Sequence, residues 1–191
     1  MVHYHGSPVG GVSAEKSRFF AGRHALVSFA YPADLGIWLD VCQSIVLDNG
    51  AFTTWKSGRK FDFDAYSVWV SALSYHPSVD WWLMPDIIAG AEQENKALAK
   101  DWMTHEFNDF GVPVYHMHES FTYLAWLVDN FPTIALGSSG EWATPGANAW
   151  WDRMADIMGY LCDAQGRPPV KLHGLRMLNP AVFQYLSLIH I

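Results

Sequence analysis

The chain has 191 residues, of which 50% are hydrophobic, 15% aromatic and 16% charged, and its formal net charge is −7. This composition supports a folded core and excludes a largely disordered chain. Proteins that bind nucleic acid through its phosphates usually carry a basic surface, whereas Lys56, Arg59 and Lys60 form only a small basic cluster here. The charge therefore argues mildly against a nucleic-acid role.

Nothing in the sequence indicates export or membrane insertion. The N-terminus lacks the basic start and apolar block of a secretory signal, and apolar runs such as 81–84 fall far short of the ~20 residues of a membrane span. Cys42 and Cys162 are too few for a disulfide framework and are not spaced as a metal clip. We therefore expect a cytoplasmic protein with no membrane association.

Short β-rich runs alternate with segments of helical periodicity along the chain. We expect helices over 91–103, around Phe121–Val128 and over Trp150–Leu161, where apolar residues recur three or four positions apart. Strands are expected at Val2–His5, Ala25–Phe29, Ser44–Asp48, Val79–Met84, Pro113–His118, Thr133–Leu136 and Val170–His173.

Alternating strands and helices are typical of an α/β fold with a parallel sheet. An open doubly wound sheet and a barrel both fit this alternation. We favour a (β/α)8 TIM-barrel-like fold because polar residues follow strand after strand, and barrel enzymes build their sites at the carboxyl ends of strands. We expect residues 1–185 to form a single domain of about seven βα units, an incomplete barrel whose last strand is missing.

The last six residues, Leu186–Ile191, match the in-frame translation of the transposase end sequence used to fragment DNA libraries. We therefore expect residues 186–191 to be read-through of a sequencing adapter, and the native sequence to stop near Tyr185. An ordinary apolar C-terminal strand is the alternative.

A carboxylate, a glycine and an aromatic residue follow the strand Ser44–Asp48. Asp48 ends the strand, and a turn through Gly50 would let Phe52 face back toward the site. A carboxylate in this place can act as a general acid or base when its surroundings tune its pKa. It can equally form an Asx-turn with its own backbone.

Asp86 is a second carboxylate just past a strand. An ionised carboxylate can accept hydrogen bonds from the adjacent N–H donors of a guanine-like ring as a bidentate pair. The alternative is an N-cap for the helix that begins near Ala91, although Asp86 lies early for that role.

His116 and His118 alternate along their strand and so share a face, while Glu119 is expected to start the next helix. A His pair on a strand is also often only hydrogen-bonded core. Gly137 and Gly140 flank two serines after the following strand, where glycine lets backbone N–H groups approach a ligand, although a tight turn explains them equally well.

His173 lies at the mouth of the last expected strand. Taken in order, these residues resemble the tRNA-guanine transglycosylases, and more closely the DpdA-like proteins of phages and bacteria that place 7-deazaguanine bases in DNA. The similarity runs through residues 3–185. It rests on residues 5–8, the Asp48 motif, Pro113–Ser120, Ala135–Glu141 and Lys171–Pro180.

The resemblance implies a base exchange in which a guanine glycosidic bond is cleaved through a covalent Asp–sugar intermediate and a deazaguanine is attached. In it, Asp48 is the catalytic acid–base residue. The partners would be a guanine or 7-deazaguanine base, and DNA or tRNA through the full-length protein. The substrate-binding residues that the resemblance implies are Phe52, Asp86, His116, His118, Gly137, Gly140 and His173.

Two departures from the family pattern bear on activity. The family's nucleophilic Asp follows the segment that ends here at Tyr185, so we expect this chain to lack it and to turn nothing over. The zinc cluster of three Cys and one His is also absent, so we expect no cofactor and no metal.

Two other functions stay open. His3, His5, His116, His118 and His173 are also the kind of histidines through which metal-dependent amidohydrolase barrels bind zinc. A non-catalytic protein that binds a nucleobase or nucleic acid is the other alternative. The acceptor, the particular deazapurine and the oligomeric state do not follow from the sequence.

Overall fold

The computed structural model describes residues 2–6, 10–177 and 179–186. It is a mixed α/β fold in which parallel strands alternate with helices. This confirms the expected α/β class, and the (β/α)8 barrel stays a prediction. The strands form a five-stranded sheet in the order β1-β2-β3-β4-β5 and a three-stranded sheet in the order β6-β7-β8. The expectation that 186–191 is not native concerns residues that, beyond Leu186, lie outside the described part of the chain.

The chain packs into two compact units. The first, here the N-terminal unit, consists of Val2–Asp86 and Lys100–Gly111, and the second, the C-terminal unit, consists of Ile87–Ala99 and the chain from Val112 onward. The boundary crosses helix α5 (Glu92–Trp102), so the helix contributes residues to both units.

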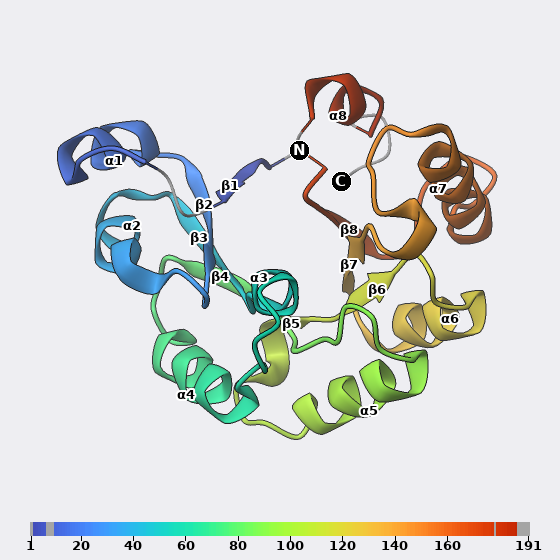
Figure 1. The fold of residues 1–191 in the computed structure, drawn as a ribbon, viewed down its shortest axis with the longest axis horizontal. Coiled ribbons are helices and arrows are strands. Elements are labelled where there is room, and N and C mark those ends of the chain that lie inside the picture. The colour runs from blue at the N-terminus through green and yellow to red at the C-terminus, as the bar shows by residue number, and fades with distance from the viewer. Residues whose placement is uncertain (1, 7–9, 178, 187–191) are drawn as a thin grey trace. The chain divides into compact units, whose positions relative to one another are not determined.

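The N-terminal unit carries the five-stranded sheet. Its strands are β1 (Tyr4–Gly6), β2 (His24–Ser28), β3 (Ser44–Asp48), β4 (Val79–Leu83) and β5 (Gly111–Val112), although Val112 is assigned to the C-terminal unit. Its helices are α1 (Ser13–Phe20), α2 (Leu35–Val41), α3 (Ala51–Lys56) and α4 (Phe63–Leu73), with short 3-10 turns η1 (Pro32–Asp34) and η2 (Asn108–Phe110). Helices α1, α2 and α4 lie along one side of β1–β4 (Figure 1).

The centre of this sheet is apolar on both faces. Ile45, Val46 and Leu47 of β3 are fully buried, as expected for a parallel strand covered on both sides. In the parallel register of β2 and β3, Ser28 pairs with Asp48. The polar ends of these two strands therefore lie side by side.

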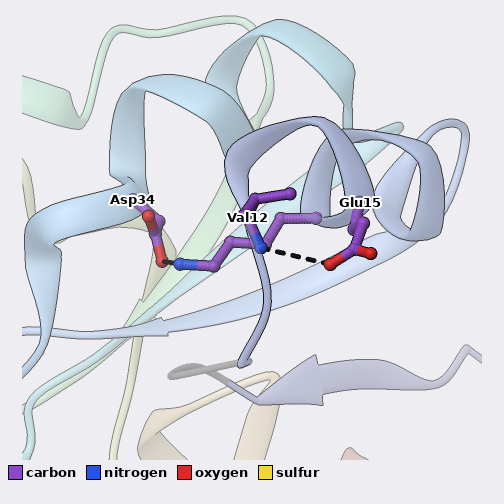
Figure 2. Close-up of polar contacts among 4 residues, drawn as sticks. Val12, Glu15 and Asp34 are labelled. Atoms are coloured by element: carbon purple, nitrogen blue, oxygen red, sulfur yellow. Dashed lines mark hydrogen bonds and ion pairs between the residues drawn. The ribbon is translucent and has the colours of Figure 1, made fainter.

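Polar contacts fix helix α1 at its start and against the turn that follows β2. The Glu15 carboxylate accepts a hydrogen bond from the backbone N–H of Val12 at 3.2 Å, which satisfies one of the free donors at the helix start (Figure 2). The Lys16 ammonium forms an ion pair with Asp34 at 2.6 Å, and this pair ties α1 to η1.

The C-terminal unit carries the three-stranded sheet. Its strands are β6 (Val114–His116), β7 (Thr133–Gly137) and β8 (Lys171–Leu175), and its helical segments are α6 (Phe121–Asn130), η3 (Gly140–Trp142), α7 (Asn148–Leu161) and α8 (Pro180–Leu186). Trp150, Ile157 and Leu161 form part of the buried face of α7, as their spacing predicts. Helices α6 and α7 lie on the same side of β6–β8 (Figure 1).

The structure differs from the sequence expectation in the bounds of one strand and in several helices. The strand expected over Pro113–His118 is shorter in the structure, where β6 covers Val114–His116. The separate strand β5 (Gly111–Val112) ends before Pro113, which has no N–H for a ladder. The helices α1, α3, α4 and α8 were not expected from the sequence. In the described residues, no helix is long and apolar enough to cross a membrane.

Candidate functional site

The chain turns sharply at the end of β3. Gly50 has φ +73° and precedes α3, and its backbone N–H donates to Asp48 Oδ2 at 3.1 Å, which is the Asx-turn that the sequence left open. A Cβ placed on Gly50 would lie 2.9 Å from the Ala30 backbone nitrogen. Glycine is therefore needed here both for its backbone conformation and for the close approach of the β2 end.

Gly50→Ala should lower the free energy of unfolding by about 2 kcal/mol, because the left-handed backbone costs about 1 kcal/mol for alanine and the contact with Ala30 adds to it. Gly22→Ala is the matched control, since Gly22 has φ +69° but open space around it. Urea denaturation of both variants measures the difference. Equal losses would show that the close contact contributes nothing.

Asp48 lies half-buried at this turn, and its carboxyl is electrostatically unusual. The pKa of Asp48 is raised to about 6, chiefly because the carboxyl is buried and also because of the nearby charge of Asp86, while the hydrogen bonds from Ser28 and Gly50 act in the opposite direction. The Asx-turn and the tuned pKa therefore coexist. A carboxyl with this pKa is present in both protonation states near neutral pH, as a general acid–base group requires.

Asn49 links the turn after β3, which carries Asp48, to the segment after β4, which carries Asp86. The sequence interpretation did not identify this residue. Its side-chain Nδ2 donates to Asp86 Oδ1 and to the Met84 carbonyl, both at 2.6 Å, and its Oδ1 accepts from the Ala51 N–H at 2.8 Å. Asn49 is buried. The available signal was an amide placed inside a strand-end motif, since a buried amide must find partners on both its ends.

Asp86 is 6% exposed and lies beyond the end of β4. Its bond to Asn49 and the start of α5 at Glu92 show that it is not the cap of that helix. Nearby, the Tyr66 hydroxyl donates to the Leu83 carbonyl at 2.6 Å, and burial, with the charges of Asp48 and Asp86, raises the pKa of Tyr66. Asp48, Asn49 and Asp86 thus form one cluster, here the carboxylate cluster, at the carboxyl ends of β3 and β4.

Phe52 lies half-buried in α3, in the same unit as the carboxylate cluster. Its ring centroid is 5.8 Å from that of Trp55, with the planes tilted by 45°. The stacking of a base on Phe52 stays a prediction.

The two histidines lie together in the C-terminal unit but differ in exposure. Their ring centroids are 5.6 Å apart with an interplanar angle of 21°. His116 is 2% exposed, whereas His118 lies past the strand end and is exposed. His118 Nδ1 is 2.8 Å from Ser139 Oγ and Nε2 is 3.2 Å from the Gly90 carbonyl, so its ring bridges two loops.

The prediction that Glu119 starts the next helix is wrong. Ser120 caps α6 by accepting from the Tyr123 N–H at 3.2 Å, and the buried Glu119 carboxylate turns back to accept from the His116 N–H at 2.7 Å. Asn95 also donates to it at 2.8 Å. Burial raises the pKa of Glu119, while His116, Asn95 and His118 act in the opposite direction.

The glycines after β7 lie next to these histidines. A Cβ on Gly137 would lie 3.1 Å from His116 Nδ1, and one on Gly140, whose φ is +58°, would lie 3.4 Å from the Cβ of His118. Close packing against the histidines therefore explains why glycine occupies both positions. This agrees with the alternative of a tight turn and requires no ligand. His173 lies in β8 in register with Ala135, is half-buried, and has its pKa lowered by burial to about 4.

Arg153 of α7 holds the loop between β6 and α6, and sequence reasoning did not find it. Its guanidinium donates to the carbonyls of Met117 and Glu119 at 2.8 Å and to the Tyr115 hydroxyl at 2.9 Å. A single basic residue on a helix otherwise patterned for burial was the only available signal.

The expected site residues thus fall into two groups. Asp48, Phe52 and Asp86 belong to the N-terminal unit, and His116, His118, Gly137, Gly140 and His173 belong to the C-terminal unit. His3 and His5 of the amidohydrolase alternative lie in the N-terminal unit, and no group of three His, Cys, Asp or Glu able to hold a metal occurs among the described residues.

Comparison with known proteins gives no relative. No family model matches the chain, and no curated protein or solved structure matches it either.

Proposed function

We propose that this chain is the base-binding part of a guanine or 7-deazaguanine exchange enzyme acting on DNA or tRNA, similar to the tRNA-guanine transglycosylases and the DpdA-like proteins, on a (β/α)8-like scaffold. The observation that carries the proposal is the carboxylate cluster: two carboxylates at the ends of adjacent parallel strands, one of them held by Asn49. The strand orders support the scaffold, since neighbouring strands follow one another in sequence in both sheets, whereas a doubly wound sheet reverses its order.

The cluster suits a guanine edge for a chemical reason. Guanine presents an N1–H and an exocyclic amine side by side, and one carboxylate can accept hydrogen bonds from both donors. Asp86 is buried and its position is fixed, which favours reading a flat base.

Asp48 is suited to the proton transfer. A pKa of about 6 lets this carboxyl donate a proton to a departing base or take one from an incoming base near neutral pH. The resemblance assigns the covalent bond to the sugar to a later Asp. The steps proposed for the described residues are therefore recognition of the base and proton transfer.

Asp86→Asn should weaken guanine binding at least tenfold, because the new NH2 group faces the N–H donors of the base while the side-chain volume is kept. Quenching of tryptophan fluorescence by guanine, 7-deazaguanine, hypoxanthine and adenine measures the effect. We expect guanine and 7-deazaguanine to bind alike, hypoxanthine to bind more weakly because it lacks the exocyclic amine, and adenine not to bind.

Asp40→Asn is the control, since Asp40 is an exposed carboxylate at the end of α2 and its loss should change nothing. Equal binding of adenine and guanine would contradict the proposed recognition. Because this chain is expected to turn nothing over, catalysis is tested with the full-length protein, by exchange of labelled guanine into DNA and into tRNA, assayed separately. Base binding by the full-length protein without incorporation would favour the non-catalytic alternative.

A further inference from the structure

A basic and aromatic segment follows directly on the carboxylate cluster. Residues 55–60, here the Trp55–Lys60 segment, contain Trp55, Lys56, Arg59 and Lys60. The three cations are exposed and the Trp55 side chain is 53% exposed. No acidic residue lies between Asp48 and Asp62, although the chain as a whole has a net charge of −7. The segment is thus a local exception to the acidic charge.

The segment has a defined shape that keeps its cations together. Helix α3 ends at Lys56, and Gly58, with φ +67°, reverses the chain so that the Arg59 N–H donates to the Thr54 carbonyl at 3.0 Å. Arg59 Nε also donates to Ser57 Oγ at 2.9 Å. The loop is therefore folded back on the helix.

Ordinary structural roles explain only part of this composition. Lys56 lies in the last turn of α3, where a cation complements the helix dipole, but Arg59 and Lys60 lie beyond the helix end. Across the described residues, the three cations form no ion pair. The next carboxylate, Asp62, is occupied as the N-cap of α4 and accepts from the Ala65 N–H at 3.0 Å.

We propose that the Trp55–Lys60 segment binds a single strand of nucleic acid, with phosphates on its three cations and an unpaired base stacked on Trp55. Exposed aromatic rings beside cations are how proteins hold single strands, because the cations attract phosphates and any base can stack on the ring. The ring of Phe52 lies beside Trp55 in the same helix and supports its orientation.

The position of the segment relates it to the carboxylate cluster. Helix α3 starts three residues after Asp48 and its six residues span about 9 Å, so the segment lies close to Asp48 along the chain. The part of the inference that places the target base at Asp48 rests on the proposed function. The binding of the strand itself does not.

The test is fluorescence anisotropy with the full chain and a labelled single strand of mixed sequence, as DNA and as RNA, over a range of salt concentrations. The triple variant Lys56→Gln, Arg59→Gln, Lys60→Gln should lose most of the binding, and the slope of log affinity against log salt should fall by about 2, since each phosphate contact on a single strand contributes about 0.7. Trp55→Ala should weaken binding about tenfold with an unchanged slope.

The control triple variant Arg18→Gln, Arg167→Gln, Lys171→Gln removes the same charge from exposed positions elsewhere. Equal loss in the control triple, or no strand binding by the unchanged protein, overturns the inference. The Asp86→Asn variant separates this inference from the proposed function. If the variant still binds the strand but loses guanine binding, both proposals are supported. If the unchanged protein binds the strand but no guanine, the proposed function alone is contradicted. A difference between the DNA and RNA arms identifies the natural strand.

Discussion

Asn49→Ala is expected to lower the free energy of unfolding by about 4 kcal/mol. The substitution removes one side chain that has three short hydrogen bonds, to Met84, Asp86 and Ala51, in a buried position. Each buried group left without a partner costs about 1–3 kcal/mol, and a charged one costs more. Urea denaturation followed by circular dichroism and tryptophan fluorescence measures the loss.

Two further variants sharpen this prediction. Asn130→Ala removes an exposed amide that makes one bond, to the Trp126 carbonyl at 2.7 Å, and should cost less than about 1 kcal/mol. Asn49→Asp keeps the acceptor for Ala51 but places a second carboxyl beside Asp86, so its stability should recover at acidic pH, where one of the two is protonated. A loss from Asn49→Ala no larger than that from Asn130→Ala would contradict the role given to Asn49.

Asp48→Asn is expected to stabilise the protein at pH 7 and above by about 3 kcal/mol and to leave its stability at pH 4 almost unchanged. The carboxyl has a pKa of about 3.9 in an unfolded chain and about 6 in the folded protein, because the fold buries it. The folded state therefore holds this proton more tightly than the unfolded state. As pH rises from about 4 to about 6 the free energy of unfolding falls, and the loss persists at higher pH.

Urea denaturation at several pH values tests this sign. The curve for the unchanged protein should diverge from that of Asp48→Asn between pH 4 and pH 6, whereas Asp40→Asn, which alters an exposed carboxylate, should follow the unchanged protein. A variant that is less stable at every pH would mean that the hydrogen bonds of Asp48 outweigh its burial. A carboxylate that weakens its own fold is typical of residues kept for function.

The strand positions were predictable because buried parallel strands consist of continuous apolar runs, which can be recognised in the sequence. Strand β3 has the expected bounds, Ser44–Asp48, since Asp48 and Gly50 end an uninterrupted apolar run. Helix α3 was not predictable in the same way. It has only six residues, contains two β-branched threonines and starts at a glycine without a side-chain cap, so neither periodicity nor capping marks it.

The candidate site was predictable in its carboxylates and not in the groups that hold them. Asp48 and Asp86 stand out because they follow strands. Asn49 and Arg153 do not, because their importance comes from partners distant in sequence, Asp86 in one case and the loop before α6 in the other. The hydrogen bond from the His116 N–H to Glu119 is local, joining residues three apart, but the carboxylate also accepts from Asn95, which is distant in sequence. The base-exchange function remains a proposal.

The interleaving of the two units has a consequence for the order in which the chain folds as it leaves the ribosome. The N-terminal unit is completed only by Lys100–Gly111, where Trp102 stacks on Tyr66 with centroids 5.5 Å apart and Phe107 approaches Trp82. Until that stretch has been synthesised, β4 is an unpaired edge and the aromatic rings behind it are uncovered. While α5 is being synthesised, the nascent chain therefore exposes an apolar surface that is prone to aggregation. A chaperone would bind the chain during this interval.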